Sequence, residues 1–574
     1  MNNKNKLANI TLILSIYGLL ALSFLSSIQI GFSWDEYFHH INGLVRFKFL
    51  NSLGEFEKYQ FRNNEFYPGL YDTLSYSVSH LIFLIKKDLF IKFLAEIMHI
   101  LNFTFSSLSI LGLYILSKKI FNKRIALFTC LLTLMNPFFF GHMGMNSKDL
   151  IIFFSLIWFC YYFYLYCASE KNVFKYLIYS SFFIGFGCGV RLTFLVVIFP
   201  VVMCGIVYLF NKYQENYLYI LKRLFLHSFV AILIIIFFII LCWPHMIVEI
   251  QNGNFINFFS LIVKNTISWL DGPKIGIING EYYEVFNTPK TYFLDVLIYR
   301  IPFYFTVLTL STYIFFFSKK LVIKNYINNF KTKFLTLNVI TFFPIILTLV
   351  LGVNIYDNLR LFLFVIPFFC LIAAFSIDQF TQFLRTGVFS KISLAFILIL
   401  FLLSFYRFII LTPYQYTYVN YSYPSFKNSK GKFEHDYWGA SYKELVEKIK
   451  SKYNKKEIEN FKIADCAGGD FTLIYYLNKS LGIKKTYSDV NDLDQATHIV
   501  MNNRAFLDIY ENVHVKDLIN RKDGSMKVKD MKKVARAPNI RKSCFSYENF
   551  KGEDSVFVSR DGLPLTIFRK LEKK

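Results

Sequence analysis

Two adjacent carboxylates and two adjacent histidines follow the first long apolar segment of this chain, in the stretch WDEYFHH at residues 34–40. An ionised carboxylate within the hydrocarbon of a membrane costs roughly 2.5–3.5 kcal/mol on insertion scales, so we expect Asp35 and Glu36 at the interface or in a wet cavity. A carboxylate in such a place can act as a general base toward an incoming hydroxyl group. The alternative is that the apolar segment has ended and that these are ordinary loop residues.

The histidines offer a second chemistry. Asp35 and His39 stand four residues apart, so on a helix they would share a face and could bind a divalent cation together with Glu36 and His40. More often such histidines line a polar groove or bond a carboxylate. We therefore expect no required cofactor and keep a divalent cation as an alternative.

Three basic residues stand at the ends of other apolar segments. Lys148 follows GHMGMNS, Arg191 interrupts GFGCGVRLTF, and Arg360 lies in YDNLRLFLFVIP. The planar fork of arginine fits phosphate oxygens and lysine supplies a point charge, so these cations are expected to bind a phosphate. The alternative is pairing with Asp149 or Asp357, and the two states can follow one another as a ligand arrives.

Composition requires that membrane-spanning helices position these residues. The chain is 55% hydrophobic, has 68 Phe and 39 Tyr among 574 residues, and has a mean hydropathy of +0.39. Its net charge of +24 comes largely from short clusters between apolar segments rather than from one patch, which argues against a nucleic-acid partner. With about 20 residues per crossing we predict about eleven spans, at residues 8–32, 89–117, 125–142, 150–168, 174–189, 192–210, 224–243, 299–318, 334–352, 360–379 and 392–411.

Charge bias orients the predicted bundle. Clusters such as SKKIFNKR and EKNVFK fall on one side, which is therefore expected to be cytoplasmic together with the N-terminus. Asp35 and the three cations fall on the other side, which would be the outer face of a bacterial inner membrane. The first span is too long for a cleaved signal peptide and is expected to be a retained helix.

Residues 1–411 are thus predicted to form a transmembrane domain and residues 412–574 a soluble extracytoplasmic domain of small α/β or α+β type. Helical spacing covers 441–453, and strands are expected at 461–465, 497–501, 555–560 and 564–570. The glycine pair in DCAGGDFT indicates a strand-to-helix turn. Cys466 and Cys544 could form a disulfide outside the cytoplasm.

A carboxylate base, phosphate-binding cations and lipid-facing helices together favour group transfer from a lipid-linked phosphate. The leaving phosphate is already a stable anion, so the protein must deprotonate the attacking hydroxyl and hold the phosphate in place. One base opposite the leaving group implies a single displacement with inversion.

Four stretches carry a resemblance to a known family: WDEYFHHINGLVRF, NEFYPGLYDTLSY, GHMGMNSKDLIIFF and YDNLRLFLFVIP. The chain resembles the C-type membrane glycosyltransferases, specifically the bacterial relatives of the protein O-mannosyltransferases in glycosyltransferase family 39, which use polyprenyl-phosphate sugars. The resemblance implies that Asp35 is the base, with Glu36 assisting acceptor placement, and that the outer cations hold the lipid phosphate. Ser147 stands where the family often has proline, which leaves the role of Lys148 less firmly defined.

Further contacts to donor or acceptor are expected from the polar and aromatic residues of these stretches and of the loop NGEYYEVF, namely His39, His142, Asn146, Asp149, Tyr67, Asp357, Tyr282 and Tyr283. Tyr282 and Tyr283 could form a platform for a sugar, and His142 could either face the donor or cap its hairpin. The acceptor hydroxyl could belong to a protein, to lipid A or to another glycan, and membrane lipids surround the bundle. Two other functions stay open: an oligosaccharide polymerase or ligase that uses a lipid-diphosphate donor, and a transporter or flippase of lipid-linked sugars.

Overall fold

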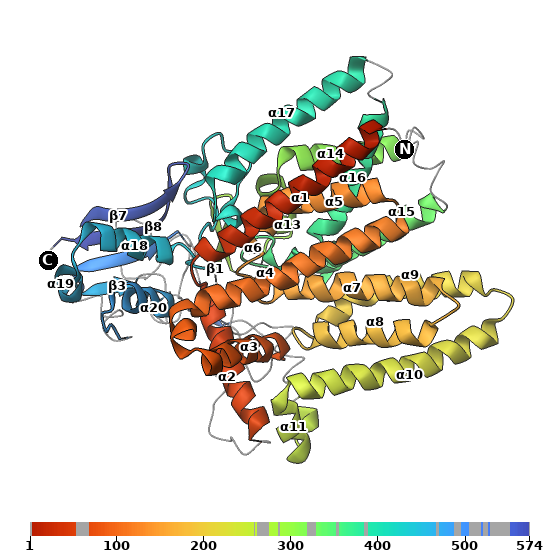
Figure 1. Ribbon diagram of the computed structural model, residues 1–574, viewed down its shortest axis with the longest axis horizontal. Coiled ribbons are helices and arrows are strands. Elements are labelled where there is room, and N and C mark those ends of the chain that lie inside the picture. The colour runs from red at the N-terminus through yellow and green to blue at the C-terminus, as the bar shows by residue number, and fades with distance from the viewer. Residues whose placement is uncertain are drawn as a thin grey trace.

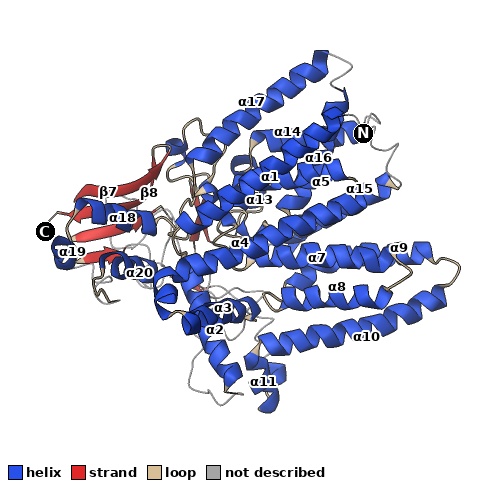
Figure 2. Cartoon of the chain, viewed as in Figure 1, coloured by secondary structure: helices blue, strands red, loops and turns tan. Residues whose placement is uncertain are grey.

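The computed structural model describes residues 3–572 except for 53–67, 258, 261–274, 285–287, 318–328, 352–354, 384–387, 466–469, 487–494, 504–517, 521–525 and 529–551. Long helices run side by side and form most of the molecule, and a small sheet domain lies at one end of them, opposite the N-terminus (Figures 1 and 2). The proposed disulfide falls outside the described residues, because neither Cys466 nor Cys544 is among them.

The helices of the bundle follow the predicted order. They are α1 (Asn3–Gln29), α4 (Lys87–Ile120), α5 (Lys123–Met135), α6 (Pro137–His142), α7 (Asp149–Ala168), α8 (Val173–Cys188), α9 (Phe194–Lys212), α10 (Tyr217–Cys242), α11 (Pro244–Gln251), α13 (Tyr292–Arg300), α14 (Phe303–Phe317), α15 (Phe330–Leu351), α16 (Ile366–Phe383) and α17 (Val388–Ile410). The break that GFGCGVR predicted between the fifth and sixth spans is confirmed, because α8 ends at Cys188 and α9 begins at Phe194.

Each of the eleven predicted spans overlaps at least one of these helices, and the chain is an integral membrane protein. Within the described ranges, seven helices are long and apolar enough to cross a membrane, or eight if α13 and α14, which meet at 112°, are counted as one broken span. The others are shorter for local reasons. The predicted span at 125–142, for example, divides at Asn136, whose side chain accepts a hydrogen bond from the Phe139 amide and starts a new helix at Pro137.

Two helices next to the predicted site were not expected from hydropathy. These are α2 (Trp34–Asn51) and α3 (Leu70–Ile85), which pack against each other at the end of the bundle that carries the sheet domain (Figure 1). A capping box begins α2: the Ser33 hydroxyl accepts from the Glu36 amide, and the Glu36 carboxylate accepts from the Ser33 amide. Asp35 therefore lies in the first turn of a helix rather than in a loop.

The C-terminal part is an α+β unit. Its four-stranded sheet has the order β3-β4-β8-β7 and contains β3 (Ile463–Asp465), β4 (His498–Asn502), β7 (Gly552–Arg560) and β8 (Leu563–Leu571), with β3 parallel to β4 and the other pairs antiparallel. The four predicted strands and the predicted helix, α18 (Tyr442–Lys452), are confirmed.

The remaining elements are β1 (Ile275–Ile278), β2 (Glu281–Glu284), η3 (Arg360–Phe362), η4 (Gln415–Thr417), η5 (Phe426–Ser429), α19 (Lys455–Asn460), α20 (Asp470–Leu481), β5 (Leu518–Asn520) and β6 (Met526–Val528).

Two buried arginines join the segment after α17 to the bundle. Arg300, at the end of α13, donates to the carbonyls of Thr417 and Tyr418 at 2.7 and 3.0 Å and to that of Glu434 at 2.6 Å. Arg407, near the end of α17, donates to four carbonyls between Val419 and Pro424. Because an arginine presents five donors in a fixed plane, each one fixes several turns of irregular chain at once.

The sheet domain also contacts the bundle directly. Lys443 of α18 and Lys479 of α20 both pair with Glu96 of α4, at 2.9 and 3.1 Å. The Tyr476 hydroxyl accepts from the Phe32 amide at 2.7 Å, just before α2 begins. One buried hydrophobic cluster accordingly extends from the bundle into the sheet, so that the C-terminal part packs as a continuation of the membrane part.

Candidate active site

A hollow of about 200 Å³ lies at the end of the bundle where α2, the start of α7 and the segment around Arg360 meet. Its lining combines residues from five separate stretches of sequence, namely Asp35, His39, Met145, Asn146, Ser147, Lys148, Asp149, Arg191, Arg360 and Trp438. Seven of these were predicted as site residues from the sequence. Charges that are hundreds of residues apart thus share one small space.

Asp35 presents its carboxylate to this hollow while Glu36 does not. The Asp35 side chain is 46% exposed and its Oδ2 lies 2.9 Å from Nη1 of Arg360. Glu36 is fully buried: besides capping α2, it bonds Nε2 of His99 at 3.1 Å and Nδ2 of Asn102 at 3.3 Å. Glu36 therefore anchors the first turn of α2 to α4 and contacts the site only through that turn.

The hairpin between α6 and α7 carries Lys148 and Asp149. The Asn146 side-chain oxygen accepts from the amides of both residues, at 3.1 and 2.8 Å, and its nitrogen donates to the Asp149 carboxylate at 3.0 Å. Asp149 also binds Nη1 of Arg191 at 2.8 Å. Asn146 thus fixes the start of α7, with a carboxylate in its first turn where the helix dipole favours one.

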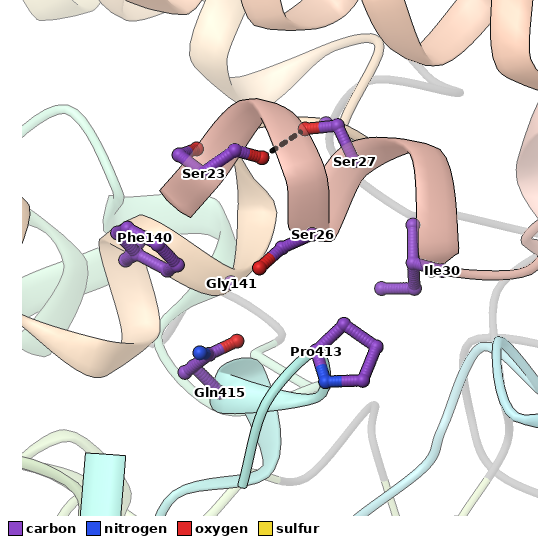
Figure 3. A pocket seen from close by; sticks show the side chains of 9 residues that line it. Ser23, Ser26, Ser27, Ile30, Phe140, Gly141, Pro413 and Gln415 are labelled. Atoms are coloured by element: carbon purple, nitrogen blue, oxygen red, sulfur yellow. Dashed lines mark hydrogen bonds between the residues drawn. The ribbon is translucent and has the colours of Figure 1, made fainter. Parts of the chain in front are cut away.

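Two glycines let this hairpin pack closely. A Cβ on Gly144 would lie 2.3 Å from the Ser27 hydroxyl of α1, and one on Gly141 would lie 2.2 Å from the Tyr416 amide of η4. Figure 3 shows the small pocket beside the hairpin, with Ser26 and Gln415 on opposite walls. The glycines of GHMGMN therefore set the depth at which Lys148 enters the site.

Arg360 is the most surrounded cation of the site. Besides Asp35, its Nη2 lies 3.3 Å from Oδ2 of Asp357 and its Nε lies 3.8 Å from Oδ2 of Asp149. Asp357 and Asn358 both have left-handed backbone, with φ of 54° and 62°, which turns the Asp357 carboxylate back toward Arg360. Burial alone would lower the pKa of Arg360, but these acidic neighbours raise it, so the guanidinium stays charged.

Charge and burial act on the other ionisable groups beside the hollow. Burial lowers the pKa of Lys148, and the nearby carboxylates of Asp72 and Asp35 oppose that shift. Burial would raise the pKa of Asp72, but the pKa is lowered because the interaction with His39 is stronger than this effect. Nδ1 of His39 lies 3.1 Å from Oδ1 of Asp72. His39 is thus paired with Asp72 of α3 rather than with Asp35.

Several predicted contacts do not face the hollow. Tyr283 is buried, donates to the Ile355 carbonyl at 3.0 Å and packs on Tyr292. His142 is buried and bonds the Phe138 carbonyl at 2.7 Å and the Tyr437 hydroxyl at 2.8 Å, so it joins the hairpin to the C-terminal segment. Asp357 supports Arg360 from behind. Packing thus keeps these polar groups away from the surface of the hollow, and their roles in donor or acceptor binding stay predictions.

Two predicted residues lie beyond what is described. Tyr67 falls in the range 53–67, and the side chain of Tyr282 is not among the described side chains. The lining also contains one aromatic residue that sequence reasoning missed, Trp438, whose ring centre lies 5.0 Å from Cζ of Arg360. The stretch GKFEHDYWGASYKE contributed to the family resemblance, but nothing in its spacing marks the tryptophan as a site residue.

The predicted metal alternative can be compared with this geometry. Glu36 and His39 each bond a different buried partner, so they do not converge with Asp35 on one point. Across the part of the chain that is described, no group of three or more His, Cys, Asp or Glu side chains is arranged to hold a metal ion.

Comparisons with known proteins agree with this architecture. Residues 84–243 match the family described as dolichyl-phosphate-mannose-protein mannosyltransferase. Among solved structures, ArnT from Cupriavidus metallidurans in the apo state has a TM-score of 0.50 at 12% sequence identity, with 98% of each chain covered. The same protein bound to undecaprenyl phosphate has a TM-score of 0.48 at 12% identity over 97% of each chain. The Archaeoglobus fulgidus oligosaccharyltransferase has a TM-score of 0.42 at 10% identity, covering 85% of this chain and 69% of that one. No curated protein matches this chain in sequence.

The family match confirms the predicted resemblance to the protein O-mannosyltransferases, and with it the predicted class of enzyme, a glycosyltransferase. The likeness to ArnT confirms the fold class: a bundle of membrane helices of the C-type glycosyltransferase kind with a small C-terminal sheet domain. The matched residues include Lys148, Asp149 and Arg191 but neither Asp35 nor Arg360. The roles of the individual site residues accordingly rest on their geometry.

Proposed function

We propose that this protein transfers a sugar from a polyprenyl-phosphate donor to an acceptor hydroxyl, with inversion, at the outer face of a bacterial inner membrane. In this proposal the N-terminus is cytoplasmic, and the helices up to residue 411 carry the site while residues 412–574 lie outside. The observation that carries the proposal is the ion pair of 2.9 Å between Asp35 and Arg360, in a hollow that Lys148 and Arg191 also line.

The charge of the hollow favours a monophosphate donor. Its lining has three cations, Lys148, Arg191 and Arg360, and two carboxylates, Asp35 and Asp149. Two more carboxylates, Asp357 and Asp72, lie beside Arg360 and Lys148. A sugar joined to a lipid through one phosphate is a phosphodiester with one negative charge. A diphosphate-linked sugar would bring a second negative charge among these carboxylates, so the surroundings fit the monophosphate donor better.

The Asp35–Arg360 pair suggests how donor binding prepares the base. Of the three carboxylates around Arg360, Asp35 is the most exposed, at 46% against 4% for Asp149 and 2% for Asp357. An arriving phosphate oxygen would therefore take the place of Asp35 at Nη1 and release that carboxylate from Arg360 beside the bound sugar. The donor would bind first, and the base would become available only once the donor is in place.

The chemical step then needs one base and no redox change. The acceptor oxygen attacks the anomeric carbon as its proton passes to Asp35, and the bond from that carbon to the phosphate oxygen breaks. The electron pair of that bond remains on the lipid phosphate, whose growing charge Arg360, Lys148 and Arg191 stabilise. No cofactor is required, because the leaving group is a stable anion without protonation. Glu36 would contribute as a positioning residue through the first turn of α2.

Purified protein in lipid vesicles tests the proposal when it is supplied with undecaprenyl-linked sugars, either monophosphate or diphosphate, and an extract of acceptor hydroxyl compounds. We expect a new glycosidic bond of inverted configuration with the monophosphate donor only. Transfer from the diphosphate donor alone would indicate a polymerase or ligase. Movement of labelled donor across the membrane without bond formation would indicate a transporter, and either result would contradict the proposal.

A further inference from the structure

Trp438 lies where the C-terminal segment meets the two groups that the proposed reaction needs most. Its side chain is 3% exposed and lines the hollow beside Arg360. Its carbonyl accepts from the Trp34 amide at 3.2 Å, one residue before Asp35. The same residue therefore contacts the base-bearing turn through its backbone and the phosphate-binding cation through its ring.

Arg360 contacts two aromatic rings as well as its acidic partners. Its Cζ lies 5.0 Å from the Trp438 ring centre and 5.2 Å from that of Tyr356, both within cation–π range. The N–H edges of the same guanidinium point to carboxylates, Nη1 to Asp35 and Nη2 to Asp357. The ring contacts are separate from these N–H contacts, so a phosphate that replaces Asp35 at Nη1 would leave the rings in place.

The chain around Trp438 is held in place on both sides. The Asp436 carboxylate accepts from the amides of Ala440 and Ser441, at 2.9 and 3.1 Å, and from the Tyr416 hydroxyl. Gly439 has φ of +66°, and a Cβ there would lie 2.4 Å from Nε1 of Trp34. A tight, buried turn thus presents the indole, which distinguishes it from an aromatic residue that happens to fill space.

We propose that Trp438 is a positioning residue that keeps the Arg360 guanidinium in one plane while its partner changes from Asp35 to the lipid phosphate. This inference rests on the proposed function and extends it, because it makes the C-terminal segment part of the donor-phosphate site. Without the indole the guanidinium can rotate, and its fork no longer meets two phosphate oxygens at once.

Equilibrium binding of undecaprenyl phosphate to the full-length protein in detergent tests this directly. We expect Trp438→Leu to weaken binding ~10-fold, in line with a desolvated cation–π contact, and Trp438→Phe to restore most of it because a ring face remains. In an Arg360→Gln background, Trp438→Leu should not weaken binding further, since the guanidinium that Trp438 orients is absent. Trp243→Leu is the matched control: it removes an equally buried tryptophan outside the hollow and should leave binding unchanged.

The outcomes separate the two proposals. Unchanged binding by Trp438→Leu, or an equal loss in the wild-type and Arg360→Gln backgrounds, would overturn the role of Trp438 and leave the proposed function standing. Absence of binding by the wild-type protein would overturn both. Equal losses of binding for Trp438→Leu and Trp438→Phe would indicate a merely structural role, because a ring face would then make no difference. That result too would overturn the inference.

Discussion

At the scale of single residues, Lys148 is the cation whose charge depends on pH. Burial lowers its pKa below the usual range of a lysine, whereas Arg360 stays protonated throughout. The positive charge of Lys148 is therefore lost at a lower pH than that of an ordinary lysine. We expect the affinity for undecaprenyl phosphate to fall as the pH rises through this lowered pKa, at pH values above the second ionisation of a phosphate, whose pKa is near 6.

Lys148→Arg is the matched variant, because arginine keeps its charge as the pH rises through this value. Its binding curve should stay flat where that of the wild-type protein declines. Parallel curves for the two proteins, or a wild-type affinity that does not change with pH, would show that Lys148 does not bind the phosphate.

At the scale of elements, the hairpin between α6 and α7 places Lys148 because Gly144 lies against α1. Gly144→Ala would put a methyl group 2.3 Å from the Ser27 hydroxyl and 2.9 Å from its Cα, so the hairpin must move outward. Such overpacking costs about 1–3 kcal/mol. Gly18 lies on α1, the helix that carries Ser27, and a Cβ at Gly18 would have no atom within 4 Å. Gly18→Ala should therefore leave the free energy of unfolding unchanged or raise it by up to about 1 kcal/mol.

Thermal unfolding in detergent measures both variants, and donor binding shows whether the site moves with the hairpin. We expect Gly144→Ala to lower both the unfolding temperature and the affinity for undecaprenyl phosphate. Equal behaviour of the two alanine variants would refute the argument that this close approach positions the site.

At the scale of the whole molecule, the C-terminal part belongs to the site, and Arg300 is one of the residues that attach it. Arg300→Met would leave the carbonyls of Thr417, Tyr418 and Glu434 without their shared donor. We expect this to lower the free energy of unfolding by about 3 kcal/mol or more. Limited proteolysis between residues 412 and 441 should become faster, and donor binding should weaken as Trp438 leaves Arg360. Arg223→Met removes a buried arginine that donates to the Tyr166 carbonyl elsewhere in the bundle, and it should affect neither.

Sequence reasoning reached the cations of the site because a membrane restricts where charge can stand. Lys148, Arg191 and Arg360 were noticeable as charges at the ends of apolar segments, and the structure brings all three to one hollow. The positions of strands and of one helix in the C-terminal part were predicted separately, from the periodicity of apolar residues. The start of α2 was not predicted, although Ser33 and Glu36 have the spacing of the capping box that the structure forms.

The remaining features depend on tertiary packing, which hydropathy does not encode. Tyr283 and His142 are polar residues in promising motifs, yet both are buried with partners behind the hollow. Glu36 differs from Asp35 only by one step along a helix, and that step of about 100° turns it toward α4. Trp438 enters the site because a turn held by Asp436 carries it there, and the Tyr416 hydroxyl and the Trp34 amide contact that turn from other segments of the chain.

The central claim is that Asp35 removes the proton from the acceptor, and Asp35→Asn tests it most directly, with Glu170→Gln as a control at a carboxylate whose side chain is 78% exposed. The measurement is the rate of sugar transfer from the undecaprenyl-phosphate donor, together with the affinity for undecaprenyl phosphate. A positioned base contributes about 10²–10⁴ in rate, so Asp35→Asn should lose that much turnover while still binding the lipid. Turnover by Asp35→Asn equal to that of Glu170→Gln in a folded protein would contradict the account.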